Sequence, residues 1–161
     1  MLPFTSISGL IFISYLITDN TYIAAVSFNC ATGVLLGFKS AYFIDPYGYE
    51  KCHKAWSQLH QLSPKQLFII DFFTHIFPVL YLSYNYNTWF DLNIMVNALY
   101  LSLSIHLLWA YITCKGLNLN RFYLENCDYQ MCDKQWHKLW SFTILGHFTS
   151  SIYHILYTEF T

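Results

Sequence analysis

Long apolar windows alternate with short polar connections along this sequence. Four windows lack Asp, Glu, Lys and Arg, and a fifth contains Asp71 as its only charged residue. They cover residues 1–18, 20–38, 66–90, 92–114 and 139–158. A helix that crosses a membrane needs about 20 mostly apolar residues, within a range of about 17–25, whereas a helix of a soluble protein carries a charged stripe on one face. The pattern therefore predicts an all-α integral membrane bundle of about five transmembrane helices.

The expected helices belong to a single multi-pass membrane domain that covers residues 1–161. They span residues 2–18, 21–44, 65–86, 89–114 and 136–157. The tripeptide Thr18-Asp19-Asn20 leaves two interpretations of the first segment open. It is either one arm of a tight helical hairpin, which we expect, or an interfacial leader before four spanning helices. A cleavable signal peptide is not expected, because the N-terminal stretch has no Lys or Arg.

Local signals define the region between the second and third expected helices. Ser63-Pro64-Lys65-Gln66 supplies an N-cap, a first-turn proline and a capping-box glutamine, and so predicts a helix start. Upstream, residues 45–62 place apolar side chains at helical spacing beside two lysines. This pattern predicts a short helix on the membrane surface.

Composition and charge support the membrane class. The chain has 161 residues, of which 55% are hydrophobic and 11% charged, against roughly 25% charged in a typical soluble domain. The net charge of −1 excludes the basic footprint of a nucleic-acid binder. We therefore expect membrane lipids, and no nucleic acid, as partners.

The distribution of positive charge predicts an orientation. The basic residues all lie in, or at the helix ends beside, the connections 45–64 and 115–135. They are Lys39, Lys51, Lys54, Lys65, Lys115, Arg121, Lys134 and Lys138. Basic residues accumulate on the cytosolic side of membrane proteins. The N-terminus and both connections are therefore expected to be cytosolic.

A stripe of small residues runs along the second expected helix at four-residue intervals. It consists of Ala25, Asn29, Gly33, Gly37 and Ala41. Gly33 and Gly37 form the close-approach motif of membrane helices. Two interpretations stay open: the stripe packs against the first or third helix of the same chain, or it forms a homo-oligomer.

Five ionisable residues fall inside the apolar windows. Because an ionisable group is costly to place within a membrane, each of these residues is a candidate functional residue. They are Asp71, His75, His106, His147 and His154. At about 1.5 Å per residue, His75, His106 and His147 lie about 12–17 Å from the cytosolic helix ends, so they share one layer. Asp71 lies one turn nearer the cytosol, at the level of Lys39.

Three interpretations of this layer compete. The three histidines and Asp71 are a full ligand set for zinc or non-haem iron, although no two histidines have a familiar metal-site spacing. Alternatively, Asp71 orients His75 as a general base, with His106 and His147 as further catalytic candidates. The third interpretation is structural: these groups, and an Asp71–Lys39 pair, only bond across helices.

The cysteines add a weaker zinc hypothesis. Cys52-His53, Cys127 and Cys132 lie in the two long connections, where His60 or His137 could complete a site, but the spacing is not that of a zinc finger. No cofactor is therefore predicted, with zinc as the alternative. On a cytosolic face these thiols stay reduced, so a Cys127–Cys132 disulfide would indicate the opposite orientation.

The segment from Phe68 to Pro78 places Asp71 and His75 before a proline, and Trp109 and a Gly116-to-Tyr123 stretch follow. This arrangement resembles the androgen-induced family of multi-pass membrane hydrolases of fatty-acid esters. The resemblance implies that His75 works with a threonine nucleophile on another helix, for which Thr21 and Thr32 are candidates. The proline is one residue closer to the histidine than in that family.

Three function classes follow from these observations. The first, and the one we expect, is a non-catalytic membrane scaffold or assembly factor, because no nucleophile or phosphate-binding motif is present. The second is an intramembrane lipid hydrolase that uses the Asp-oriented His75. The third is a proton-coupled transporter or channel subunit with a path from His75 to His154.

Overall fold

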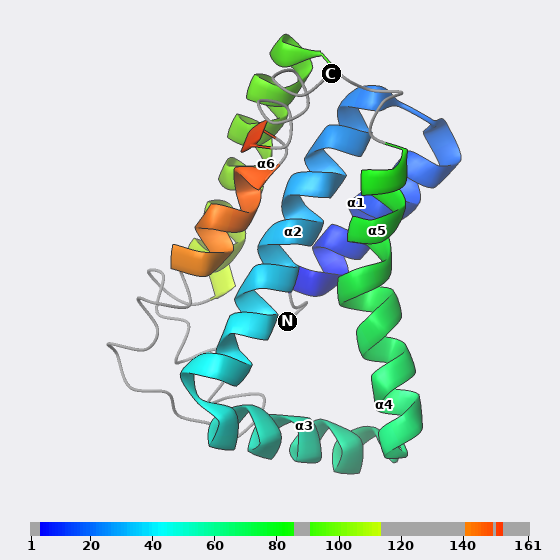
Figure 1. The fold of residues 1–161 in the computed structure, drawn as a ribbon, viewed down its shortest axis with the longest axis vertical. Coiled ribbons are helices and arrows are strands. Elements are labelled where there is room, and N and C mark those ends of the chain that lie inside the picture. Colours follow the sequence, from blue (N-terminus) through cyan, green and yellow to red (C-terminus); the bar gives the residue numbers. More distant parts are fainter. Residues whose placement is uncertain (1–3, 86–90, 114–140, 150, 153–161) are drawn as a thin grey trace.

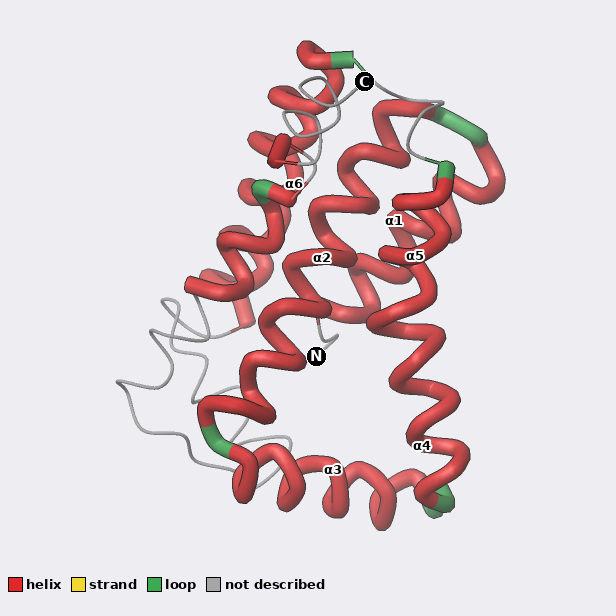
Figure 2. Tube along the Cα trace, viewed as in Figure 1, coloured by secondary structure: helices red, strands yellow, loops and turns green. Residues whose placement is uncertain are grey.

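The computed structural model describes residues 4–85, 91–113, 141–149 and 151–152. Every regular element in these ranges is helical (Figure 2), which confirms the all-α class. Three helices are long and apolar enough to cross a membrane: Thr21–Ile44, Pro64–Tyr84 and Leu92–Ile112. The helix Phe4–Thr18 is apolar but shorter.

The first two helices, α1 (Phe4–Thr18) and α2 (Thr21–Ile44), form a hairpin, in which α1 is shorter than the three helices of membrane length. That α1 spans a membrane stays a prediction. Asp19 takes a left-handed backbone conformation with φ 48°, which reverses the chain. The Asn20 side chain then accepts hydrogen bonds from the N–H groups of Tyr22 and Ile23. An asparagine N-cap satisfies donors that a helix start leaves unpaired. The polar tripeptide is therefore a turn between two packed helices.

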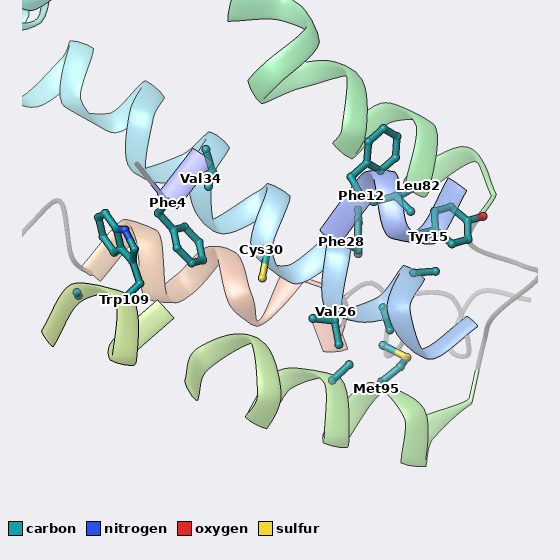
Figure 3. Close-up of a cluster of buried hydrophobic side chains, with 14 residues drawn as sticks. Phe4, Phe12, Tyr15, Val26, Phe28, Cys30, Val34, Leu82, Met95 and Trp109 are labelled. Carbon is teal, nitrogen blue, oxygen red and sulfur yellow. The ribbon is translucent and has the colours of Figure 1, made fainter. Parts of the chain in front are cut away.

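Helix α2 is the centre of the bundle. In its most apolar window 67% of the residues are buried, against 33% for Leu92–Ile112 and 11% for Pro64–Tyr84. Figure 1 shows α5 on one side of α2, and α6 (Leu92–Thr113) with residues 141–147 on the other. The core combines side chains from α1, α2, α5 and α6 (Figure 3), including Phe12, Phe28, Leu82 and Met95.

Helix α3 (Pro46–His60) crosses from the end of α2 to the start of α4 (Pro64–Asp71), as Figure 1 shows. The predicted capping box is present: Gln66 N–H donates to the Ser63 hydroxyl, and the Ser63 N–H donates to the Gln66 side chain. This cap starts α4 at the predicted residue. The helix expected within residues 45–62 is also present.

The helix expected at residues 65–86 contains a wide turn. It consists of α4, a π-helical turn η1 (Phe72–Ile76) and α5 (Phe77–Tyr84). A proline inside a helix lacks an N–H and its ring collides with the carbonyl four residues earlier, which for Pro78 is that of Thr74. The Phe77 N–H bonds to the Phe72 carbonyl, so the turn is one residue longer than in an α-helix. π-helical turns occur frequently at functional sites, and His75 lies within this one.

Large apolar side chains cover the outer surface of the bundle. Ile17, Phe68 and Tyr111 are 78%, 68% and 66% exposed, and no residue of α4 is buried. Soluble monomers rarely expose contiguous apolar patches larger than a few hundred Å². This surface is compatible with a membrane protein.

Candidate functional site

Asp71, at the end of α4, has a basic partner on each carboxylate oxygen. Its Oδ2 lies 2.7 Å from Lys39 Nζ of α2, and its Oδ1 lies 2.9 Å from His75 Nδ1. The side chains of Asp71 and His75 are 11% and 12% exposed, and that of Lys39 is 35% exposed. A carboxylate held between two basic side chains in a largely buried position is fixed in orientation.

The surroundings of His75 define its tautomer. Besides the carboxylate, Nδ1 lies 3.2 Å from the Asp71 backbone oxygen and 2.9 Å from the Thr74 hydroxyl. Carbonyl and carboxylate oxygens only accept hydrogen bonds, so Nδ1 carries a proton. In the described part of the chain, Nε2 has no hydrogen-bond partner. In its neutral form the ring therefore presents Nε2 as a proton acceptor.

The His75 ring is held by stacking rather than by hydrogen bonds to other helices. It lies flat on the Phe38 ring of α2, with centroids 4.1 Å apart and an interplanar angle of 7°. Its hydrogen-bond partners, Asp71 and Thr74, belong to its own helical segment. A histidine that served only as polar glue would bond across to a second helix. His75 does not do so within the described residues.

Helix α3 brings a second histidine to this site. The Tyr49 ring lies 5.1 Å from Phe38 and stacks on His53 at 4.9 Å, between centroids. Burial lowers the pKa of His53 below 6.5; Asp71 opposes this shift, and Lys39 and His75 add to it. His53 is therefore neutral at pH 7.

A cavity of about 700 Å³ lies between α2, α3 and α4. Its polar lining includes Lys39, Asp71, His53 and Lys54. Its apolar lining includes Tyr42, Phe43, Leu67 and Phe68. Pockets of about 300–1,000 Å³ commonly bind small molecules. The cavity therefore has both polar and apolar walls, and the ion pair of Lys39 and Asp71 forms part of its polar wall.

His106 and His147 form a separate cluster with Ser102. His106 Nδ1 lies 2.7 Å from His147 Nε2, and His147 Nδ1 lies 3.1 Å from Ser102 Oγ. The Ser102 hydroxyl donates to the Leu99 carbonyl at 3.0 Å, so its oxygen accepts from His147 Nδ1–H. His147 Nε2 then accepts from His106 Nδ1–H. The chain of bonds is self-consistent with both rings neutral.

This second cluster is enclosed. His147 and Ser102 are 0% exposed and His106 is 5% exposed. The Phe4 ring of α1 stacks on His106 with centroids 3.9 Å apart. Hydrogen bonds join α6 to the segment that carries His147, and a ring stack adds α1. This arrangement corresponds to the structural interpretation of these histidines.

Glycines allow the segment that carries His147 to reach α2. A Cβ placed on Gly33 would lie 2.8 Å from His147 Nε2, and one on Gly146 would lie 2.5 Å from Gly33 Cα. A Cβ on Gly37 would collide with the Thr143 hydroxyl. Gly33 and Gly37 thus face residues 143–147 of the same chain, not the first or third expected helix. A homo-oligomer through these glycines stays a prediction.

The structure therefore divides the predicted layer of histidines. His75 and Lys39 both pair with Asp71 beside α2, whereas His106 pairs with His147 on the side of α6. The two sets separate because the rotation of each helix about its axis, which depth does not specify, directs their side chains to different neighbours. His154 lies outside the described residues.

Among the described residues, no group of three or more His, Cys, Asp or Glu side chains could hold a metal ion. Zinc stays a prediction, since Cys127, Cys132, His137 and the side chain of Cys52 are outside that description. Cys30 is buried and free. The Thr32 hydroxyl donates to the Phe28 carbonyl, and within the described residues neither Thr21 nor Thr32 is a hydrogen-bond partner of His75.

Sequence reasoning did not find three residues of these clusters. Ser102 lies four residues before His106, so their shared helix face was a usable signal. His53 was considered only as a zinc ligand. The depths predicted from the sequence place Lys39 level with Asp71, but they do not specify that the adjacent Phe38 ring turns toward His75 and stacks on it.

No family model, curated protein or solved structure matches the chain.

Proposed function

We propose that the protein is an integral membrane hydrolase of acyl lipids in which Asp71 and His75 act as an acid–base pair. One observation carries the proposal: Oδ1 of the Asp71 carboxylate lies 2.9 Å from Nδ1 of His75, while Nε2 has no partner within the described residues. A histidine oriented in this way by a carboxylate is a general base in many hydrolases. The resemblance to the androgen-induced family, in which His75 matches the functional histidine, favours the same class.

The proposal includes five membrane spans with the α3 side in the cytosol. Three helices of membrane length and the exposed apolar surface support insertion. Figure 1 shows α3 and the start of α4, which carry Lys51, Lys54 and Lys65, at one end of the bundle. The turn between α1 and α2, which contains Asp19, and the start of α6, which follows Asp91, lie at the opposite end. This is the charge asymmetry of the positive-inside rule.

The chemistry follows from the available nitrogen. Since no hydroxyl side chain in the described residues bonds to Nε2, we assign water as the nucleophile. Nε2 takes a proton from water while the water oxygen bonds to the acyl carbon and the carbonyl electrons move onto its oxygen. When this intermediate collapses, the ester C–O bond breaks and the leaving alkoxide takes the proton from Nε2. The products are a carboxylic acid and an alcohol.

The charged neighbours have separate roles in this step. Asp71 keeps the ring oriented and stabilises the imidazolium that forms when Nε2 is protonated. The ammonium of Lys39 lies on the other oxygen of the same carboxylate, and we assign it to stabilise negative charge on the substrate oxygen. The proposed reaction requires that both water and the acyl chain of a lipid reach Nε2 of His75.

The test is hydrolysis of a fluorogenic long-chain acyl ester by the purified protein in nanodiscs. We expect H75Q to lower kcat by about 10²–10⁴-fold, the usual contribution of a general base, and D71N to lower it by a smaller factor. H60Q is the matched control, because His60 is exposed at the end of α3, and it should keep full activity. Wild-type protein without activity above empty nanodiscs, or three variants with equal activity, would contradict the proposal.

Each alternative class has its own outcome. If the wild-type protein folds but hydrolyses none of the esters, a non-catalytic scaffold or assembly factor is the function that remains. The enclosed network of His106, His147 and Ser102 favours that class, because it stabilises the bundle without a reaction. A proton-coupled transporter stays a prediction, since the path to His154 lies outside the described residues.

A further inference from the structure

We infer that the cavity between α2, α3 and α4 binds an anionic phospholipid of the cytosolic leaflet, with its phosphate held by Lys54, His53 and Lys39. This inference rests on the orientation given above. It does not rest on hydrolysis, because binding requires neither His75 nor a reaction.

The hydrogen-bond capacity of the lining favours an anion. Lys54 has no ion-pair partner within the described residues, so its ammonium offers three donors. Lys39 gives one donor to Asp71 and keeps two. His53 stacks on Tyr49 and forms no hydrogen bond to the described residues. Three side chains from two helices therefore direct unused donors to one cavity.

The acceptors that line the cavity are mostly engaged. Asp71 Oδ2 pairs with Lys39, and Oδ1 lies 2.9 Å from His75 Nδ1; the Ser57 hydroxyl donates to the Leu62 carbonyl. Glu50, exposed on α3, is the one lining carboxylate without a partner in the described residues. An anionic ligand must tolerate Glu50, whereas a cationic ligand would bind to it. The effect of replacing Glu50 on ligand affinity therefore shows whether the ligand is anionic or cationic.

The apolar part of the lining favours a lipid over a soluble phosphate. Phe43 and Phe68, on the two helices that flank the opening, are 79% and 68% exposed, and Tyr42 is 52% exposed. In a bilayer these side chains contact acyl chains. Basic pockets between transmembrane helices on the cytosolic side bind anionic lipid headgroups, and the cytosolic leaflet is rich in such lipids. In the orientation given above, the polar end of the cavity lies at the level of these headgroups.

The test is native mass spectrometry of delipidated, detergent-purified protein titrated with phosphatidylglycerol. Dioleoylglycerol, with the same acyl chains and no phosphate, and inorganic phosphate, with no acyl chains, are the comparison ligands. We expect one phosphatidylglycerol to bind at least tenfold more tightly than either. Equal affinity for dioleoylglycerol would show a merely apolar groove, and equal affinity for inorganic phosphate would show a soluble-anion site. Either result overturns the inference.

Three substitutions on α3 locate the site. K54E should weaken phosphatidylglycerol binding at least tenfold, whereas K51E, the same charge change on an exposed residue that does not line the cavity, should have little effect. E50Q should tighten binding severalfold. Equal losses in K54E and K51E would indicate generic surface charge, and weaker binding in E50Q would indicate a cationic ligand group; both contradict the inference. E50Q keeps the test valid if K54E fails to fold.

The two proposals can fail separately. H75Q should bind phosphatidylglycerol like the wild-type protein and still lose ester hydrolysis. Ester hydrolysis by a wild-type protein that does not bind phosphatidylglycerol would refute only the lipid site. Intact binding by a protein without hydrolytic activity would refute only the hydrolase.

Discussion

The contact between Gly146 and α2 provides the sharpest test of the packing. A Cβ added at Gly146 would lie 2.5 Å from Gly33 Cα and 2.6 Å from both Gly33 N and the Thr32 carbonyl oxygen. All three are backbone atoms, so no side chain can rotate away. Carbon atoms prefer a separation of about 3.5–4.0 Å, so G146A must push residues 143–147 away from α2 by roughly 1 Å.

The cost of G146A has two opposing contributions. Overpacking of a well-packed contact costs about 1–3 kcal/mol, and the shift also stretches the bonds of His147 to His106 and Ser102, which in membranes average about 0.6 kcal/mol each. Alanine in place of a helical glycine returns about 0.8–1.0 kcal/mol. We therefore expect G146A to lower the free energy of unfolding by about 1–3 kcal/mol.

The assay is an SDS titration of the protein in mixed micelles, followed by tryptophan fluorescence. The control is G9A, because a Cβ on Gly9 meets no atom within 4 Å; this variant should be more stable than the wild-type protein by about 0.4–1 kcal/mol. G146A should unfold at lower SDS and G9A at higher SDS. If G146A is as stable as G9A, the close approach of residues 143–147 to α2 is wrong.

Three further predictions use the same assay. S102A should destabilise the fold by about 1 kcal/mol, because His147 Nδ1–H loses its acceptor in a buried site, whereas S104A, at an exposed position of the same helix, should be neutral; equal effects would argue against the network. S27A should leave stability unchanged or raise it by about 1 kcal/mol, since the buried Ser27 hydroxyl has no partner in the described structure, and a clear loss would reveal one. Because burial lowers the pKa of native His53 below 6.5, the unfolded chain binds the proton first, so the His53 contribution is complete above pH 6.5 and falls as the pH drops through the native pKa. The stability difference between wild-type protein and H53Q should shrink over that range, and a difference independent of pH would contradict the shift.

Local chemistry allowed much of the fold to be predicted from the sequence. The left-handed Asp19 and the Asn20 cap form the expected turn, and Ser63 with Gln66 forms the expected helix start. These features depend on residues within four positions of each other. The Asp71–His75 contact is of the same kind, because residues four apart share one face of a helix. For this reason the sequence alone was enough to propose the pair.

Only the tertiary structure decided which helices the buried groups meet. The sequence sets the depth of His106 and His147 along their helices, but not the direction that each side chain takes. The packing of glycines 33 and 146 brings His147 to α2 and His106, whereas the ring of Phe38 brings α2 to His75. Helix order and rotation in a bundle depend on contacts between segments distant in the chain. Local spacing carries no information about those contacts, so a single layer of histidines in the sequence became two separate clusters in the fold.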